Sequence, residues 1–181
     1  MIGVFFAEGF EEIEALTVVD ILRRANLQTE MISITDKMAV KGSHGIEVSM
    51  DTRLADVDVQ ALDMMVLPGG QPGTKNLELC TELMQELDMF EKAGKPISAI
   101  CAAPTIFGHR GYLEGRDACC YPGLEEQLRG AKVSYEPAVV DEHITTGRGM
   151  GCAIDFALAI VERFQGKEAA EKLGKAVVYR V

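Results

Sequence analysis

The chain has no run of basic residues and no long apolar segment. Its 18 Lys and Arg residues are outnumbered by 28 Asp and Glu residues, which gives a formal net charge of −10. Proteins that bind nucleic acid or anionic membranes need clustered cations to neutralise phosphates. No apolar run approaches the roughly 18 residues that span a bilayer. We therefore expect neither nucleic acid nor a membrane as a partner.

Targeting and disulfide signals are also lacking. Met1 leads directly into the apolar segment 2–6, with no basic region and no cleavage site, which is typical of a strand rather than a signal peptide. The five cysteines are an odd number without framework spacing, so we expect reduced thiols in a cytoplasmic protein. Because there is no repeat, linker or low-complexity segment, residues 1–181 are predicted to form one domain.

Apolar segments of strand length alternate with helical patterns along the chain. Strands are predicted over residues 2–7, 29–34, 63–67 and 96–100, and the first helix over 10–25. This alternation is typical of an α/β fold, in which a mainly parallel sheet is covered by helices on both faces.

The segment Ser98–Thr105 (SAICAAPT) contains the strongest candidate for chemistry. A buried strand is predicted to end before Cys101, and Pro104 suits the first turn of a following helix. The free amides and partial positive charge of a helix start lower the pKa of a cysteine placed there. Such a strand–turn–helix is also the geometry of a nucleophile elbow. The alternative is a buried, inert cysteine.

The first predicted helix carries an acidic residue on its apolar face. At 100° per residue, Phe10, Val18 and Ile21 lie on one arc. Glu14 lies in the middle of that arc, whereas Glu12 points the opposite way, toward water or a partner subunit. Burial of Glu14 would raise its pKa unless another group pairs with it. The alternative is a glutamate that reaches solvent from the first turn, where the helix dipole favours acids.

A glycine-rich loop, Pro68–Gly73 (PGGQPG), directly follows the predicted strand 63–67. Parallel α/β sheets bind ligands outside the carboxyl ends of their strands, and Cys101 is expected at the same edge. The backbone amides of Gly70 and Ala102 are therefore predicted to form an oxyanion hole. The alternative is a loop that is merely tight. The loop lacks the Gly-Lys-Ser/Thr ending of a P-loop.

The segments Ala99–Thr105 (AICAAPT) and Leu67–Gly70 (LPGG) resemble the ThiJ/PfpI family, and the resemblance runs over nearly the whole chain. The branch that it resembles most contains a parkinsonism-associated oxidative-stress protein and deglycases. The resemblance implies a flavodoxin-like, class I glutamine amidotransferase-like fold. This is a three-layer α/β/α sandwich with a mainly parallel sheet, a nucleophile elbow at Cys101 and a homodimeric assembly. Glu11–Glu14 (EEIE) resembles the family signature whose final acid is hydrogen-bonded to the cysteine.

This resemblance implies a cysteine-dependent reaction on small reactive carbonyls such as methylglyoxal. The expected activity is of glyoxalase or deglycase type, linked to carbonyl or oxidative stress, with no metal and no organic cofactor. Cys101 would attack the carbonyl and Glu14 would move protons. The alternative is a non-enzymatic oxidant sensor or redox-regulated chaperone that uses the same cysteine. Peptidase activity is not expected, because Ala102 stands where the protease-like branch carries a histidine.

Four more residues are expected to line the site: Gly69, Tyr121, Arg148 and His44. Tyr121 precedes Pro122 at a place where the resembled branch often carries a histidine. Because tyrosine is a poor base near neutral pH, this departure favours the sensor alternative. His44 aligns near a family position that borders the site and usually carries arginine.

Two residue pairs carry lesser predictions. Leu16 and Val19 form a second apolar edge on the first helix, which is a hint of a dimer surface. Cys119 and Cys120 are adjacent in a predicted strand, so one should point inward and the other outward. The outward thiol would be either a secondary oxidation site or a small apolar residue.

Overall fold

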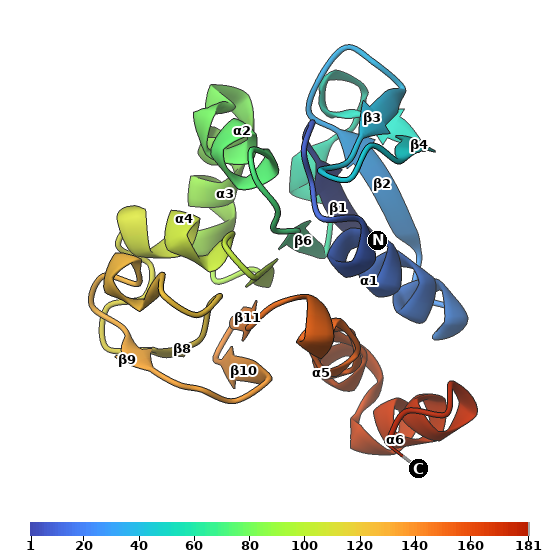
Figure 1. The fold of residues 1–181 in the computed structure, drawn as a ribbon, viewed down its shortest axis with the longest axis vertical. Helices are drawn as coiled ribbons and strands as arrows, with labels where there is room; N and C mark the ends of the chain where they lie inside the picture. Colours follow the sequence, from blue (N-terminus) through green and yellow to red (C-terminus); the bar gives the residue numbers. More distant parts are fainter. Residues whose placement is uncertain (181) are drawn as a thin grey trace.

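A seven-stranded sheet forms the centre of the computed structural model, which describes residues 1–180 (Figure 1). The strand order is β10-β11-β7-β6-β1-β2-β5. The strands are β1 (Ile2–Phe6), β2 (Thr29–Ser33), β5 (Thr52–Arg53), β6 (Met64–Leu67), β7 (Ile97–Ile100), β10 (Ala138–Asp141) and β11 (Ile144–Gly147). All neighbouring pairs are parallel except β10 and β11. The predicted, mainly parallel sheet is thus confirmed.

Helices cover both faces of this sheet (Figure 1). They are α1 (Glu12–Arg24), α2 (Gly73–Leu79), α3 (Thr81–Lys92), α4 (Pro104–His109), α5 (Ala153–Gln165) and α6 (Lys167–Ala176). Successive side chains of β1 enter different cores: Phe5 packs in the core that includes Phe90 of α3, and Phe6 in the core that includes Val18 of α1 and Phe156 of α5. Because both faces are covered, every residue of β1, β6 and β7 is buried.

Two small two-stranded units lie outside the main sheet. The antiparallel pair β3 (Ala39–Lys41) and β4 (Glu47–Ser49) forms a hairpin after β2, and β8 (Asp117–Ala118) pairs in parallel with β9 (Lys132–Val133). The remaining elements are the short 3₁₀ helices η1 (Leu54–Asp56), η2 (Val59–Ala61), η3 (Glu125–Gln127) and η4 (Met150–Cys152).

Because β8 ends at Ala118, the strand alternation does not extend to the vicinal cysteines. Cys119 and Cys120 are both buried, with 0% and 2% of their surface exposed. The backbone amide of Cys119 donates to the Thr146 hydroxyl at 3.0 Å. The prediction that one of the two thiols points outward is therefore wrong.

No helix within residues 1–180 combines the length and the apolar character that a membrane crossing requires.

Candidate active site

Cys101 lies at the sharp turn between β7 and α4, at the carboxyl edge of the sheet. Its φ of +65° is in the left-handed region that residues other than glycine seldom adopt, and such strain concentrates at functional sites. Two backbone hydrogen bonds hold the turn. The Cys101 amide donates to the Gly147 carbonyl at 2.9 Å, and the Cys101 carbonyl accepts from the Tyr121 amide at 2.8 Å. The predicted elbow is confirmed, with a half-buried thiol.

Glu14 projects from the first turn of α1 into the interior, where only 1% of its surface is exposed. Its Oε2 accepts a hydrogen bond from the Gly69 amide at 3.1 Å, and its carboxyl group lies beside the Cys101 side chain, close enough for each to shift the pKa of the other. Its second oxygen, Oε1, is buried without a hydrogen-bond partner. Helical periodicity therefore placed Glu14 correctly, and the fold brings it to the thiol.

The glycine loop allows this approach. A Cβ added at Gly69 would lie 2.5 Å from the Cys101 Cβ and 2.6 Å from Glu14 Oε2, so a side chain there would force the acid and thiol apart. Gly70 has a φ of +94°, and a Cβ there would lie 2.3 Å from the Glu11 nitrogen. These two close approaches are the physical reason for the Gly-Gly pair.

The pKa values of Glu14 and Cys101 are both raised. Burial is the largest cause for Glu14 and, with the charge of Glu11, brings its pKa from 4.5 to about 7. The Cys101 side chain and the backbone amides of Gly69 and Met150 act in the opposite direction. Burial also raises the pKa of Cys101, and the neighbouring Glu14 charge raises it further. The expectation of a lowered thiol pKa is therefore wrong, because burial and the carboxylate outweigh the helix start.

The backbone amides of Gly70 and Ala102 both face the sulfur. Each favours negative charge there and lowers the pKa of the Cys101 thiol against the larger opposing effects. Two donors converging beside the nucleophile are what an oxyanion hole requires. Their catalytic role stays a prediction.

The other predicted lining residues divide into those at the thiol and those away from it. Tyr121 is 52% exposed and is tied by its amide to Cys101. The Arg148 guanidinium instead stacks on Tyr135, with 5.6 Å between its Cζ and the ring centroid. It also donates to the Tyr135 carbonyl at 3.4 Å. No hydrogen bond or ion pair within residues 1–180 joins Arg148 to Cys101 or Glu14.

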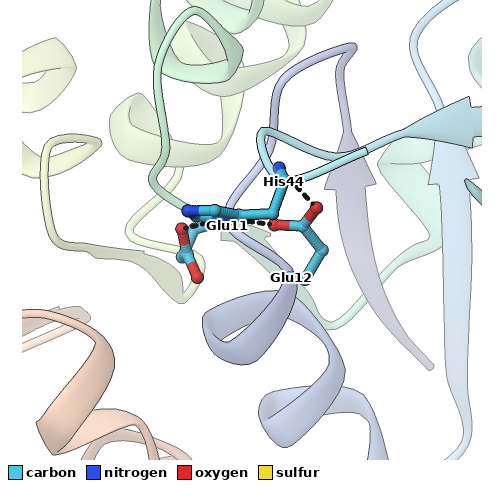
Figure 2. Close-up of side chains that lie close together, drawn as sticks. All are labelled: Glu11, Glu12 and His44. Carbon is cyan, nitrogen blue, oxygen red and sulfur yellow. Dashed lines mark hydrogen bonds and ion pairs between the residues drawn. The ribbon is translucent and has the colours of Figure 1, made fainter. Parts of the chain in front are cut away.

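His44 lies against the acidic residues at the start of α1 rather than at the thiol (Figure 2). Glu12 is only 4% exposed, and its carboxylate accepts from the His44 amide at 2.7 Å and contacts His44 Nδ1 at 3.0 Å. Burial acts to raise the pKa of Glu12, but the hydrogen bonds with His44 and Ser43 bring it down to about 2. The expectation that Glu12 points toward water or a partner is thus wrong.

Glu11, Glu12 and His44 are also the residues that could hold a metal ion. One ligand atom from each lies within 4.8 Å of the others, which is the one group of this kind in the described part of the chain. These side chains already bond to one another: the carboxylate of Glu12 contacts His44 Nδ1 at 3.0 Å, and this hydrogen bond raises the pKa of His44. The arrangement therefore fastens the β3–β4 loop to α1.

A model of the DJ-1/PfpI family matches residues 1–163 of this chain. The chain belongs to the DJ-1/PfpI family. It is 36% identical over 176 residues to "Protein DJ-1 homolog B" of Arabidopsis thaliana, a match that covers 96% of this chain and 40% of that protein. The chain thus spans less than half of that longer relative.

In two further matches the alignment covers nearly all of this chain and nearly all of the related protein. The chain is 33% identical over 169 residues to "Glutathione-independent glyoxalase DJR-1.2" of Caenorhabditis elegans, covering 93% of this chain and 90% of that protein. Oxidised DJ-1 of Toxoplasma gondii superimposes with a TM-score of 0.94 at 32% identity, covering 99% of this chain and 98% of that one. These matches confirm both the family resemblance and the flavodoxin-like fold.

Proposed function

We propose that this DJ-1/PfpI protein converts small 1,2-dicarbonyls such as methylglyoxal to hydroxy acids, as a cysteine-dependent glyoxalase that needs no glutathione. The observation that carries the proposal is the contact between the Cys101 thiol and the buried Glu14 carboxyl, beside the amides of Gly70 and Ala102. The relative named as a glutathione-independent glyoxalase supports it.

The raised pKa values favour general-base catalysis over a preformed thiolate. As the Cys101 sulfur adds to the aldehyde carbon, Glu14 takes the thiol proton and passes it to the carbonyl oxygen, which the Gly70 and Ala102 amides hold and which becomes a hydroxyl. Glu14 is then ionised again. The product of this step is a hemithioacetal. The same addition would act on the adducts that methylglyoxal forms with amines and thiols, which is the deglycase form of the activity.

An internal transfer of hydrogen completes the reaction. Glu14 removes the hydrogen from C1 as a proton and returns a proton to C2, while the proton of the C1 hydroxyl passes to the C2 oxygen. C1 thereby becomes a thioester carbonyl and the C2 ketone becomes an alcohol. Water then hydrolyses the thioester, which releases lactate and restores the Cys101 thiol. C1 is oxidised and C2 is reduced, so methylglyoxal plus water gives lactate without an external oxidant or reductant.

A second candidate is an oxidant sensor or redox-regulated chaperone with incidental turnover. The observation that favours it is the lack of an imidazole base: within residues 1–180, no histidine contacts Cys101 or Glu14. His44 contacts Glu12, His109 pairs with Glu78, and His143 lies near Glu91. In this case Cys101 would be oxidised to a sulfinate.

Turnover and its pH dependence distinguish the two candidates. We expect the protein to form lactate from methylglyoxal without glutathione, at a rate proportional to protein concentration. Because Glu14 acts as a base only when ionised, and its pKa is about 7, kcat/KM should rise as the pH passes 7 and level off above it. Lactate measured by NMR from pH 5 to 9 tests this. No lactate above the buffer blank, with clean sulfinate formation at Cys101 under peroxide, would support the sensor.

We further propose that the protein is a homodimer formed through the exposed surface of α1 and α5. Ile13 is 52% exposed, and a shallow hollow beside it is lined by Leu16 of α1 and Ile154 of α5. Exposed apolar surface of this kind marks interaction sites. Val19, the other residue of the predicted edge, is instead buried in the core, so that part of the prediction is wrong.

Light scattering of the wild-type protein as it elutes from a size-exclusion column should give twice the mass of one chain. Ile13→Asp should give the mass of one chain, because a buried unpaired charge at the interface is costly. Leu79→Asp serves as the control, since Leu79 is 68% exposed on α2, whose core is on the other face of the sheet. A monomeric wild-type protein, or an Ile13→Asp variant that stays dimeric, would contradict this assembly.

A further inference from the structure

Glu14 Oε1 is a buried polar atom that the pairing with Cys101 does not use. Its partner oxygen, Oε2, is occupied by the Gly69 amide, whereas Oε1 has no partner at full hydrogen-bond geometry although the residue is 1% exposed. The backbone amide of Met150, next to Gly149, is close enough to lower the pKa of Glu14 but does not complete a hydrogen bond to Oε1. Buried polar atoms are nearly always paired, so an exception at a reactive site calls for a specific explanation. One explanation is that substrate supplies the missing partner.

The space beside Oε1 lies over Gly149, in the segment that links β11 to α5. A Cβ placed at Gly149 would have Tyr121 Cδ2 at 3.3 Å, Tyr121 Cε2 at 3.9 Å and Glu14 Oε1 at 4.0 Å as its three nearest neighbours. A methyl group on Gly149 would therefore fill this gap and press slightly against the Tyr121 ring. The Tyr121 ring bounds it on one side and the free carboxyl oxygen on the other.

Backbone conformation does not account for the glycine. Gly149 has φ 162° and ψ −169°, which is extended backbone open to any residue. What glycine provides at this position is the unfilled space.

We propose that Gly149, the Tyr121 ring and Glu14 Oε1 form the subsite for the second carbon of a 1,2-dicarbonyl, and that Gly149 sets the size of the substituent this carbon carries. The inference rests on the proposed function. With C1 bonded to Cys101, the oxygen on C2 lies against Oε1 and accepts a hydrogen bond from it once Glu14 has taken up a proton, and the C2 substituent lies against the tyrosine ring. The two oxygens of Glu14 thus have different roles: Oε2 lies on the side of the thiol, and Oε1 contacts the substrate.

The experiment compares Gly149→Ala with Gly151→Ala for glyoxal, in which C2 carries hydrogen, and methylglyoxal, in which C2 carries methyl. Gly151 is the matched control because a Cβ there meets no atom within 4 Å. One misplaced methyl group changes kcat/KM by roughly 10–200-fold. We expect Gly149→Ala to lower the ratio of methylglyoxal to glyoxal activity by about 10-fold or more. Gly151→Ala should leave the ratio unchanged.

An equal loss of activity for both substrates, or no loss for either, would overturn the subsite.

Protection of Cys101 from alkylation gives a readout that does not depend on turnover. Intact-protein mass spectrometry follows the alkylation of Cys101 by iodoacetamide at increasing concentrations of each dicarbonyl. The quantity compared is the dicarbonyl concentration that halves the alkylation rate. In Gly149→Ala, that concentration should rise for methylglyoxal and much less for glyoxal. If the wild type forms no lactate but shows this size-selective loss of protection, the proposed function fails and the subsite stands; an unchanged pattern of protection overturns the subsite.

Discussion

Replacing Cys101 with serine should reduce lactate formation from methylglyoxal by at least about 10³-fold, the scale on which the loss of a nucleophile acts in other enzymes. A serine hydroxyl is a far weaker acid and a poorer nucleophile than a thiol, so addition to the carbonyl should be much slower even with Glu14 in place as the base. The substitution keeps the shape of the side chain and its place at the elbow. Loss of activity would therefore report on the sulfur itself.

Cys152→Ser is the matched control for this variant. Cys152 is also a half-buried free thiol, and it is the N-cap of α5, a position that serine favours. We expect it to retain wild-type turnover, as measured by lactate NMR at pH 8, with circular dichroism to verify that both variants are folded. A Cys101→Ser variant that kept more than a small fraction of the activity would remove the chemical basis of the proposed function.

Replacing Glu14 with glutamine should lower activity and raise stability at the same time. Within residues 1–180, Glu14 is the acid that lies beside the thiol and can accept its proton. Without it, kcat/KM should fall by roughly 10²–10⁴-fold, the usual contribution of a general base. The stability gain follows from the raised pKa. Because the pKa of Glu14 is 4.5 unfolded and about 7 folded, folding disfavours the ionised form.

The penalty is absent below pH 4.5, grows as the pH rises from 4.5 to 7, and is complete above 7. A shift from 4.5 to about 7, at about 1.36 kcal/mol per pKa unit, makes that penalty about 3 kcal/mol at pH 8. Glutamine carries no charge, so the variant should be more stable than the wild type at pH 8 by up to this amount. The two proteins should differ little at pH 4. Urea unfolding at both pH values measures the difference.

Glu12→Gln on the same helix is expected to behave in the opposite way. The pKa of Glu12 is lowered to about 2 by its hydrogen bonds, chiefly with His44, although burial opposes the shift. Its ionised form therefore stabilises the fold above pH 4.5, and this contribution is lost only as the pH falls toward 2. Removing the charge of Glu12 should destabilise the protein at pH 8.

The result for Glu14 can contradict its own prediction. A Glu14→Gln variant that is no more stable than the wild type at pH 8 would show that the pKa of the Glu14 carboxyl is not raised by burial.

The sequence predicted most of what local geometry controls. The alternation of short apolar segments with helical patterns indicated a mainly parallel sheet, and helical periodicity placed Glu14 on the inner face of α1. The strand–cysteine–helix pattern around Cys101 located the elbow, since a strand end and a helix start lie within a few residues of each other. These features depend on neighbouring residues and survive without knowledge of the rest of the chain.

Contacts between distant segments were not predictable in the same way. Glu12 is on the polar side of α1 by periodicity, yet the β3–β4 loop covers it, and His44 lies 32 residues away in the chain. Arg148 follows β11 near the site, but its guanidinium is held by Tyr135. The proposed subsite over Gly149 was also not predictable, because a glycine between Arg148 and Met150 does not by itself indicate a space for substrate.

The amino-acid sequence by itself determined the layered α/β fold, the elbow cysteine and the inward-facing acid of this DJ-1/PfpI protein, because the period of apolar residues and the residues flanking a turn act over short distances. Only the tertiary structure decided the charge state of the pair. Burial and the neighbouring carboxylate raise the pKa of Cys101 against the helix start. The pKa shift that burial causes depends on every segment packed around the site, so it cannot be predicted from any single stretch of the sequence.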